Sequence, residues 1–575
     1  MMKKRGDSSS TFPDEVLEHV LLFVVSIKDR SAVSLVCKAW YRAEAWSRRK
    51  VFIGNCYSVS PEILVRRFPK ITGITLKGKP RFSDFNLVPP HWGADIHPWL
   101  LVIRGAYPWL RELRLKRMIV TDESLELIAR SFSDFRALSL TTCEGFSTDG
   151  LAVIATHCRN LQELDLQESE VDDRGGYWLS CFPESCVSLV SLNFACLQSE
   201  VNFDALQRLV ARCISLRSLK LNKTLSLEQL KRLLVIAPQL MELGTGSFFQ
   251  ELSGPQFTTD LENAFKNCNK LRTLSGMWEV APLYLPALYS VCSNLTFLNL
   301  SYAANIRSME LGRLVSHCPQ LRRLWVLDTV GDKGLETVSS NCKNLRELRV
   351  FPLDPFGQDR VGVTEKGILK ISQGCPNLSY VLYFCRQMTN AAIIEVAQNC
   401  PRLTHFRLCI MNPCQPDHLT DEPMDEAFGA IVKICKGLQR LAISGLLTDK
   451  AFEYIGLYAK NLETLSVAFA GSSDLGMECV LRGCPKLRKL EIRDSPFGNA
   501  ALLSGLEQYE SMRSLWMSSC KVTMSGCRYL AQNKPRLNVE IIKENDEDDN
   551  DADKLYVYRT IAGPRRDAPN FVLTL

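Results

Sequence analysis

A short pattern recurs along most of this chain. In eleven copies of the pattern, from Cys158 to Cys484, cysteine, two further residues and leucine stand together, and most copies continue as leucine, two residues, leucine, one residue and an apolar residue. Examples are LQELDL from Leu161, LRSLKL from Leu216 and LRELRV from Leu345, and neighbouring copies cluster 24 to 28 residues apart. This interval indicates that the chain stacks one kind of unit many times.

The pattern is that of a leucine-rich repeat, in which each unit supplies one strand and one helix. Stacked units form a curved solenoid with a parallel sheet on the concave side and helices outside, so we expect an α/β fold. The 575 residues are too many for one ordinary core, and 46% hydrophobic with 23% charged residues excludes a mainly disordered protein. No run of 18 apolar residues occurs, so we expect neither a membrane span nor secretion.

The cysteines follow the same period. We expect those of the repeat at the corner between helix and strand, where a small apolar group packs between neighbouring units. A zinc or disulfide site would need close pairs such as Cys-x-x-Cys, and the sequence has none. Free thiols, no metal, and a reducing compartment, the nucleus or the cytosol, are therefore expected.

Alternation along each strand sorts side chains between the two faces of the sheet. In LRELRVF, which begins at Leu345, the leucines and the valine point into the core, and Glu347, Arg349 and Phe351 point to the concave surface. Basic residues on or beside such strands are Lys77, Lys116, Arg117, Arg349, Arg407, Arg440, Arg488, Lys489 and Arg513.

These cations predict an anionic ligand. Two charges about 4 Å apart repel by roughly 4 kcal/mol at an effective dielectric near 20, so a crowded cluster favours a compact polyanion. The alternative is a set of separate cations, each paired with a local acid such as Glu347 or Glu491. The net charge of +6 is too small to indicate direct nucleic-acid binding.

Three repeats carry extra residues after the strand, near 78–100, 352–366 and 410–426. All three insertions should emerge from the same rim of the solenoid. Long loops that converge on one face commonly bind a ligand or partner, although tolerated surface insertions would give the same pattern.

The first fifty residues differ from the repeats. Pro13 and the two acids after it suit the first turn of a helix, and Val16, Val20 and Phe23 keep helical spacing. So small and apolar a unit needs a partner, or else it caps the first repeat. The segments FPDEVL and LVCKxW resemble an F-box, which implies docking on a Skp-type adaptor of a cullin–RING ubiquitin ligase. We expect adaptor contacts from Phe12, Pro13, Val16, Leu17, Val36 and Trp40.

No catalytic motif of the forms GxSxG, HExxH or GxxxxGK[ST] occurs. An F-box that precedes leucine-rich repeats indicates a substrate adaptor that performs no covalent chemistry, so we expect no catalytic residues and no enzyme activity.

Longer segments resemble the auxin receptors of plants, the transport-inhibitor-response and auxin-signalling F-box family. The resemblance covers nearly the whole chain, in segments such as LKGKPRFSDFNLVP, LKRMIVTDESLELIA, LYFCRQMTNAA and LEIRDSPFGNAALL. It implies that auxin is a molecular glue for a transcriptional repressor, in the nucleus, with inositol hexakisphosphate or a related inositol polyphosphate as cofactor. The sister jasmonate receptor shares the architecture, but this chain keeps Phe82 and Phe85 where that receptor has other residues.

The resemblance assigns residues to three sites, and Arg407 would bind both the cofactor and the auxin carboxylate. It places at the cofactor Lys77, Lys116, Arg117, Arg349, His405, Arg407, Arg440, Arg488, Lys489 and Arg513. It places around auxin Phe82, Phe384, Arg407, Leu408, Ala442, Ile443, Ser466, Val467, Ala468 and Phe469. It places against the repressor Asp84, Phe85, Pro355, Phe356, Phe384, Cys409, Ser444, Gly445, Ala468, Phe469 and Arg493.

Three positions depart from the family pattern. Ala442 replaces a serine that would donate to the auxin carboxylate, Arg81 replaces a histidine of the pocket loop, and His405 replaces an arginine of the phosphate site. A lost hydroxyl bond to a charged acceptor costs about 1.5–3 kcal/mol if nothing substitutes. We expect an altered preference among auxin analogues, like that of the picolinate-responsive branch.

The predicted organisation is a flexible tail over 1–11, an F-box over 12–52, the solenoid over 53–543, and an acidic loop with a capping strand over 544–575. Two other functions stay open: an F-box adaptor that recognises its substrate without hormone, and a jasmonate-type receptor.

Overall fold

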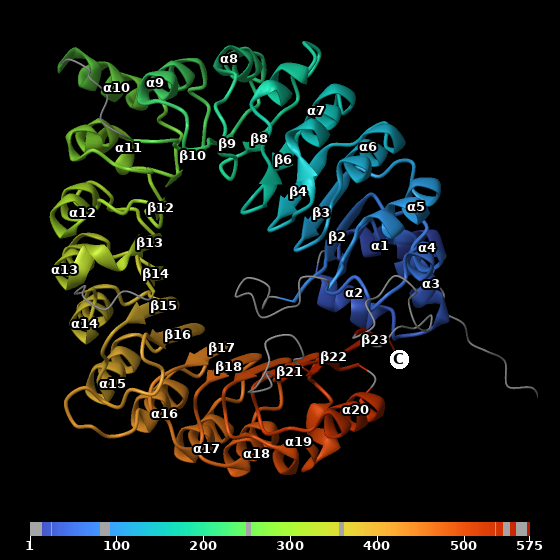
Figure 1. The fold of residues 1–575 in the computed structure, drawn as a ribbon, viewed down its shortest axis with the longest axis vertical. Coiled ribbons are helices and arrows are strands. Elements are labelled where there is room, and N and C mark those ends of the chain that lie inside the picture. Colours follow the sequence, from blue (N-terminus) through green and yellow to red (C-terminus); the bar gives the residue numbers. More distant parts are fainter. Residues whose placement is uncertain are drawn as a thin grey trace, which may run out of the picture.

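The computed structural model describes residues 14–24, 26–80, 92–248, 255–355, 362–534, 536–543, 553–558 and 572–574. Strands follow one another around the inside of a nearly closed ring, and helices cover the outside (Figure 1). The predicted α/β solenoid behind an N-terminal helical unit is therefore confirmed. Within the described ranges, no helix is both long and apolar enough to cross a membrane.

Parallel pairing runs through the whole inner sheet up to its last repeat. After β21 the chain returns antiparallel in β22, and β22 is parallel to β23. The strands of the large sheet are β1 (Lys50–Ile53), β2 (Gly73–Lys77), β3 (Glu112–Lys116), β4 (Ala137–Thr141), β6 (Glu163–Asp165), β8 (Ser191–Asn193), β9 (Ser218–Lys220), β10 (Glu242–Gly244), β11 (Thr273–Ser275), β12 (Phe297–Asn299), β13 (Arg323–Leu327), β14 (Glu347–Phe351), β15 (Tyr380–Cys385), β16 (His405–Ile410), β17 (Arg440–Ile443), β18 (Thr464–Ala468), β19 (Lys489–Arg493), β20 (Ser514–Ser518), β21 (Asn538–Lys543), β22 (Asp553–Tyr558) and β23 (Val572–Thr574). A second, two-stranded sheet pairs β5 (Phe146–Ser147) with β7 (Val171–Asp172).

Helices occupy the outer layer of the ring. Those of the solenoid are α4 (Pro61–Arg67), α5 (His97–Ala106), α6 (Asp122–Ser131), α7 (Thr148–His157), α8 (Phe203–Arg212), α9 (Leu227–Ile236), α10 (Pro255–Asn267), α11 (Tyr289–Cys292), α12 (Ser308–Val315), α13 (Gly331–Asn341), α14 (Glu365–Gly374), α15 (Asn390–Asn399), α16 (Asp425–Ile434), α17 (Asp449–Tyr458), α18 (Asp474–Gly483), α19 (Asn499–Leu503) and α20 (Met524–Asn533). Short 3-10 helices stand at Tyr177–Cys181, Pro282–Leu288, Asp328–Val330 and Leu506–Tyr509.

The alternation predicted for the strands is present. In β14, Leu348 and Val350 are completely buried, whereas Glu347, Arg349 and Phe351 stay partly exposed on the concave side. One continuous apolar core therefore runs between the sheet and the helices through all repeats.

The repeat cysteines lie where the pattern predicts, directly after the helices. Cys342 ends α13, is buried, and donates its thiol to the carbonyl of Cys318 at 3.7 Å, and Cys375 donates likewise to Cys342 at 3.4 Å. None of the 22 cysteines forms a disulfide. Each buried cysteine of the repeat pattern fills the corner between two repeats and partly satisfies a main-chain carbonyl there.

Carboxylates at helix N-termini join successive repeats. Asp425 begins α16 and accepts hydrogen bonds from the amide (2.9 Å) and hydroxyl (2.6 Å) of Thr448, the residue that caps α17. Asp449 accepts in the same way from Ser473, the cap of α18. An anion also suits the positive end of its own helix, so one side chain stabilises two helices.

The N-terminal unit consists of α1 (Asp14–Leu22), α2 (Ile27–Val33) and α3 (Lys38–Ser47) around a small core of Leu17, Leu21 and Ala43. Its Glu44 is 1% exposed and pairs with Arg48 at 2.5 Å and with Arg67 of α4 at 3.2 Å. Arg30 also lies 3.9 Å from this carboxylate, and the pair with Arg67 fixes the unit against the first repeat.

Candidate ligand and partner sites

The N-terminal helices expose a large apolar surface. Phe23 and Leu35 are each 84% exposed, Val36 is 64% exposed, and Val16 and Val20 are about half exposed. Contact with the first repeat leaves these side chains uncovered, as a docking unit requires. Leu17 lies in the core of the unit and Trp40 packs against that core. Phe12 and Pro13 lie outside the described residues.

The middle of the concave face is a row of side chains from adjacent strands. In register, Arg407 of β16 lies beside Ala442 of β17, followed by Ser466 of β18, Glu491 of β19 and Trp516 of β20. The half-buried Arg407 has no hydrogen bond or ion pair with any of the residues that the structure describes. Its five N–H donors are thus available to a ligand.

Cations from both ends of the solenoid come together. Burial lowers the pKa of Lys77 in β2, and the charges of Arg117, Lys116, Lys489 and Arg440 lower it further. Figure 1 shows β2 facing the last strands across the opening of the ring. Closure of the ring therefore crowds the positive groups that the sequence spreads over distant repeats.

Other predicted cofactor residues are held more firmly by the protein. The guanidinium of Arg349 lies 4.2 Å from the Trp325 ring and 4.6 Å from the Tyr380 ring, and its Nε donates to Glu347 at 2.7 Å. His405 stacks on Tyr380 with ring centroids 4.9 Å apart. Burial, and then the charge of Arg440, lower the pKa of His405.

Arg117 has a left-handed backbone (φ 53°) and donates from Nε to the carbonyl of Lys79 at 2.9 Å. Arg513 donates to the carbonyls of Glu510 and Met512, and burial followed by the charges of Arg536 and Arg488 lowers its pKa. Main-chain carbonyls, not local acids, therefore hold these two guanidinium groups.

Local pairing accounts for two cations in particular. Glu347 pairs with Arg349, and Glu491 pairs with Lys489 at 2.5 Å. Lys77 has mainly cations as electrostatic neighbours instead. A cluster of both kinds leaves positive charge uncompensated around Lys77.

The residues assigned to auxin divide between the two faces of the sheet. Leu408, Ile443 and Val467 are below 5% exposed and belong to the core, so a ligand on the concave face would meet only their main chain. Phe384, Ser466 and Ala468 are partly exposed. Phe469 is 36% exposed with φ 53°, and its ring lies 5.7 Å from the guanidinium of Arg493.

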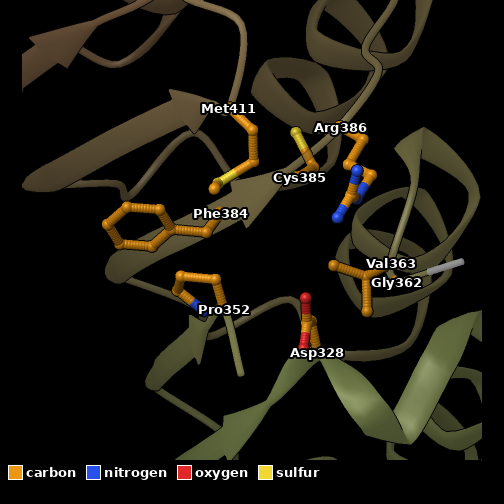
Figure 2. Close-up of a pocket in the computed structure, with 8 residues that line it drawn as sticks. All are labelled: Asp328, Pro352, Gly362, Val363, Phe384, Cys385, Arg386 and Met411. Atoms are coloured by element: carbon orange, nitrogen blue, oxygen red, sulfur yellow. The ribbon is translucent and has the colours of Figure 1, made fainter. Parts of the chain in front are cut away.

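A small pocket opens at the rim where the strands end (Figure 2). Phe384, Pro352 and Met411 form its apolar side, and Arg386 and Asp328 lie at the other side. Of these residues the sequence predicted only Phe384. Pro352 and Met411 each stand directly after a strand that carries an insertion, which was the available signal.

The third insertion packs on β17. Ser444 accepts a hydrogen bond from the amide of Ile410 at 3.1 Å, and the amide of Gly445 donates to Pro413 at 3.0 Å. Gly445 has φ 103°, and a Cβ there would lie 2.9 Å from Met424. These two residues, predicted to contact a repressor, therefore position the loop beside Cys409, which pairs in register with Phe384.

Several predicted positions cannot be placed in this site. Phe82, Asp84, Phe85, Phe356 and Arg81 lie outside the described residues. Pro355 is exposed at the end of a described range. No group of three or more His, Cys, Asp or Glu side chains in the described ranges could hold a metal ion.

Three family models match the chain: an F-box over 9–50, a transport inhibitor response 1 protein domain over 69–115, and a leucine-rich repeat over 157–180. The chain is 54% identical to GRR1-like protein 1 of Arabidopsis thaliana, over 98% of this chain and 97% of that protein. It is 53% identical to a transport inhibitor response 1-like protein of Oryza sativa subsp. japonica, over 97% and 96%. Coronatine-insensitive protein 1 of Arabidopsis thaliana is 32% identical, over 98% and 96%.

The F-box match implies a partnership with the Skp-type adaptor of a cullin ligase, which fits the exposed apolar helices at the N-terminus. The near-complete coverage extends the relationship through the solenoid. The chain belongs to the F-box and leucine-rich-repeat family of transport inhibitor response 1-like proteins.

Proposed function

We propose that the chain is an auxin receptor and the substrate-recognition subunit of a Skp–cullin–F-box ubiquitin ligase. Auxin acts as a glue: it fills the space between the concave face and a hydrophobic segment of a transcriptional repressor, which is then ubiquitylated. The chain positions its substrate and contributes no catalytic group. Because the proposed substrates regulate transcription, we place this function in the nucleus.

The main support for this proposal is the environment of Arg407. Among the described residues it is a half-buried guanidinium without an anionic partner, next to the short side chain of Ala442. A carboxylate is the natural partner for a guanidinium fork. A small aromatic acid would also add apolar area beside Phe384, and the repressor's anchors would supply the rest of the affinity.

The cations around Lys77 fit an inositol polyphosphate. Burial and four neighbouring positive charges disfavour the charged form of Lys77, which an anion with several phosphates would reverse. Lys77, Lys116, Lys489 and Arg440 would hold such a group, with Arg349 already oriented between two aromatic rings. The bound polyanion would supply negative charge beneath Arg407 and keep the ring closed.

The test is capture of a repressor degron by the chain purified with its adaptor, with and without auxin. We expect capture that depends on auxin and is lost in Arg407→Ala, and a polyphosphate that co-purifies. Degron capture unchanged by auxin would identify a hormone-independent adaptor. Capture of a different repressor with a jasmonate conjugate would identify the second kind of receptor.

A further inference from the structure

The concave row contains a gap between a cation and an anion. Arg407 stands on β16 and Glu491 on β19, and the two strands between them present only Ala442 and Ser466. At about 4.8 Å per strand, the backbones that carry the two charges are about 14 Å apart. Ala442 and Ser466 have the smallest side chains of the row, so a ligand that lies along the row would lie over them.

Glu491 is fixed at the far end of this gap. It is 7% exposed, its Oε1 pairs with the Lys489 ammonium at 2.5 Å, and its Oε2 accepts a hydrogen bond from the Ser466 hydroxyl. A carboxylate paired with an ammonium has no proton to donate. The hydrogen bond between the two side chains therefore runs in one direction, from Ser466 to Glu491.

This direction determines what Ser466 can offer a ligand. A hydroxyl has one proton and two lone pairs, and Glu491 takes the proton. Toward the gap, Ser466 then presents only acceptor capacity. An N–H group on the ligand can donate to it, whereas an unprotonated ring nitrogen or a carbonyl would face lone pairs.

We propose that Glu491, acting through Ser466, makes the site selective for aromatic acids that carry an N–H donor on the side away from the carboxylate. Glu491 is a positioning residue here, and Ser466 touches the ligand. This inference rests on the proposed function, because it takes the ligand's carboxylate to be bound by Arg407.

Two ligands of similar shape separate the donor from the rest of the molecule. Indole-3-acetic acid has a ring N–H, and 1-naphthaleneacetic acid has an aromatic C–H surface instead. For each, the half-maximal concentration in auxin-dependent degron capture is measured on the full chain with its adaptor. The readout is the ratio of the two half-maximal concentrations. A general loss of stability, or of carboxylate binding by Arg407, changes both concentrations alike and leaves their ratio unchanged.

Three variants test the path of the proton. Ser466→Ala should reduce the preference for the indole ligand roughly fivefold to tenfold, the effect of one hydrogen bond. Glu491→Gln should reduce it as much, since the amide N–H₂ can donate to Ser466 and turn its hydroxyl toward the ligand. The double variant should match Ser466→Ala alone, because the two residues act in series. Glu163→Gln is the matched control, since Glu163 pairs with Arg114 at 2.6 Å on other strands of the sheet, and it should keep the wild-type ratio.

The outcomes are distinct. Auxin-dependent capture with the same ratio in wild type, Ser466→Ala and Glu491→Gln would overturn this inference and leave the proposed function standing. Additive losses in the double variant would also overturn it, since they would show independent roles. If neither ligand promotes capture by the wild-type protein, the proposed function and this inference both fall.

Discussion

Lys77 and Lys489 repel one another across the opening of the ring, although they belong to strands near opposite ends of the sheet. This relationship ties the shape of the whole solenoid to charge at one place. It also gives the predicted cofactor a measurable thermodynamic effect.

Binding of inositol hexakisphosphate should raise the melting temperature. At a ligand concentration about 100 times Kd, the stabilisation is about 2.7 kcal/mol. Lys77→Met should itself raise the melting temperature of the ligand-free protein slightly, because it removes a partly buried cation from a positive cluster, and it should reduce the shift caused by the ligand. Differential scanning fluorimetry with and without ligand checks both. If the ligand raises the melting temperature of Lys77→Met as much as that of the wild type, this would contradict a contact between Lys77 and the polyphosphate.

His405 should make polyphosphate binding depend on pH. Burial and Arg440 hold its folded pKa below the usual 6.5, so the ligand-free protein is stabilised by the neutral ring above about pH 6.5 and loses that stability as pH falls through the lower folded value. A bound polyanion favours the charged ring, so affinity should rise as pH falls from 8 to 6. Calorimetry at several pH values measures the affinity of the wild type and of His405→Arg for the ligand. The ligand phosphates titrate in both experiments, so the part of the pH dependence that comes from His405 should be missing only in the arginine variant.

The exposed apolar surface of the N-terminal helices should bind the adaptor. Phe23→Asp should abolish co-purification of the Skp-type adaptor with little change in melting temperature, because Phe23 is 84% exposed. Leu17→Ala should instead destabilise the unit by about 2–5 kcal/mol, since it opens a cavity in a small core. Adaptor binding by Phe23→Asp at the wild-type level would exclude this surface.

Ala442→Ser should change ligand preference. Its hydroxyl would lie one strand from Arg407 and could donate to a carboxylate bound there, which is worth about 1.5–3 kcal/mol. We expect a lower half-maximal concentration of indole-3-acetic acid in degron capture and a smaller advantage for a picolinate auxin. Identical dose curves for the two proteins with both ligands would contradict a role for this position.

The link between Asp425 and Thr448 should stabilise the joint between two repeats. Asp425→Ala removes the acceptor of an amide and a hydroxyl, both partly buried, and should cost about 1–3 kcal/mol. Thr448→Val in the Asp425→Ala background should add less than it does alone, because both changes break the bond between the Thr448 hydroxyl and Asp425. Urea unfolding of the four proteins measures this coupling.

The repeat period predicted the fold because leucines at fixed spacing can be buried in only one stacked arrangement, and Leu348 and Val350 lie where alternation puts them. The same alternation placed Arg407 on the concave face, whereas Ser466 was named only through the family resemblance. It could not show that Lys77 feels the charge of Lys489, since their separation depends on how far the ring curves. Nor could it show that Glu491 orients the Ser466 hydroxyl, because hydrogen-bond direction depends on side-chain conformations that a period does not encode.

Repulsion between like charges near the two ends of the incomplete ring tends to widen its opening. Salt screens this repulsion, and a bound polyanion would neutralise it. The width of the opening through which a peptide would enter should therefore depend on ionic strength as well as on the curvature of the repeats. Lys77 and Lys489 would in this way help to set the width of the opening, and without a bound polyanion the chain would bind a peptide more weakly.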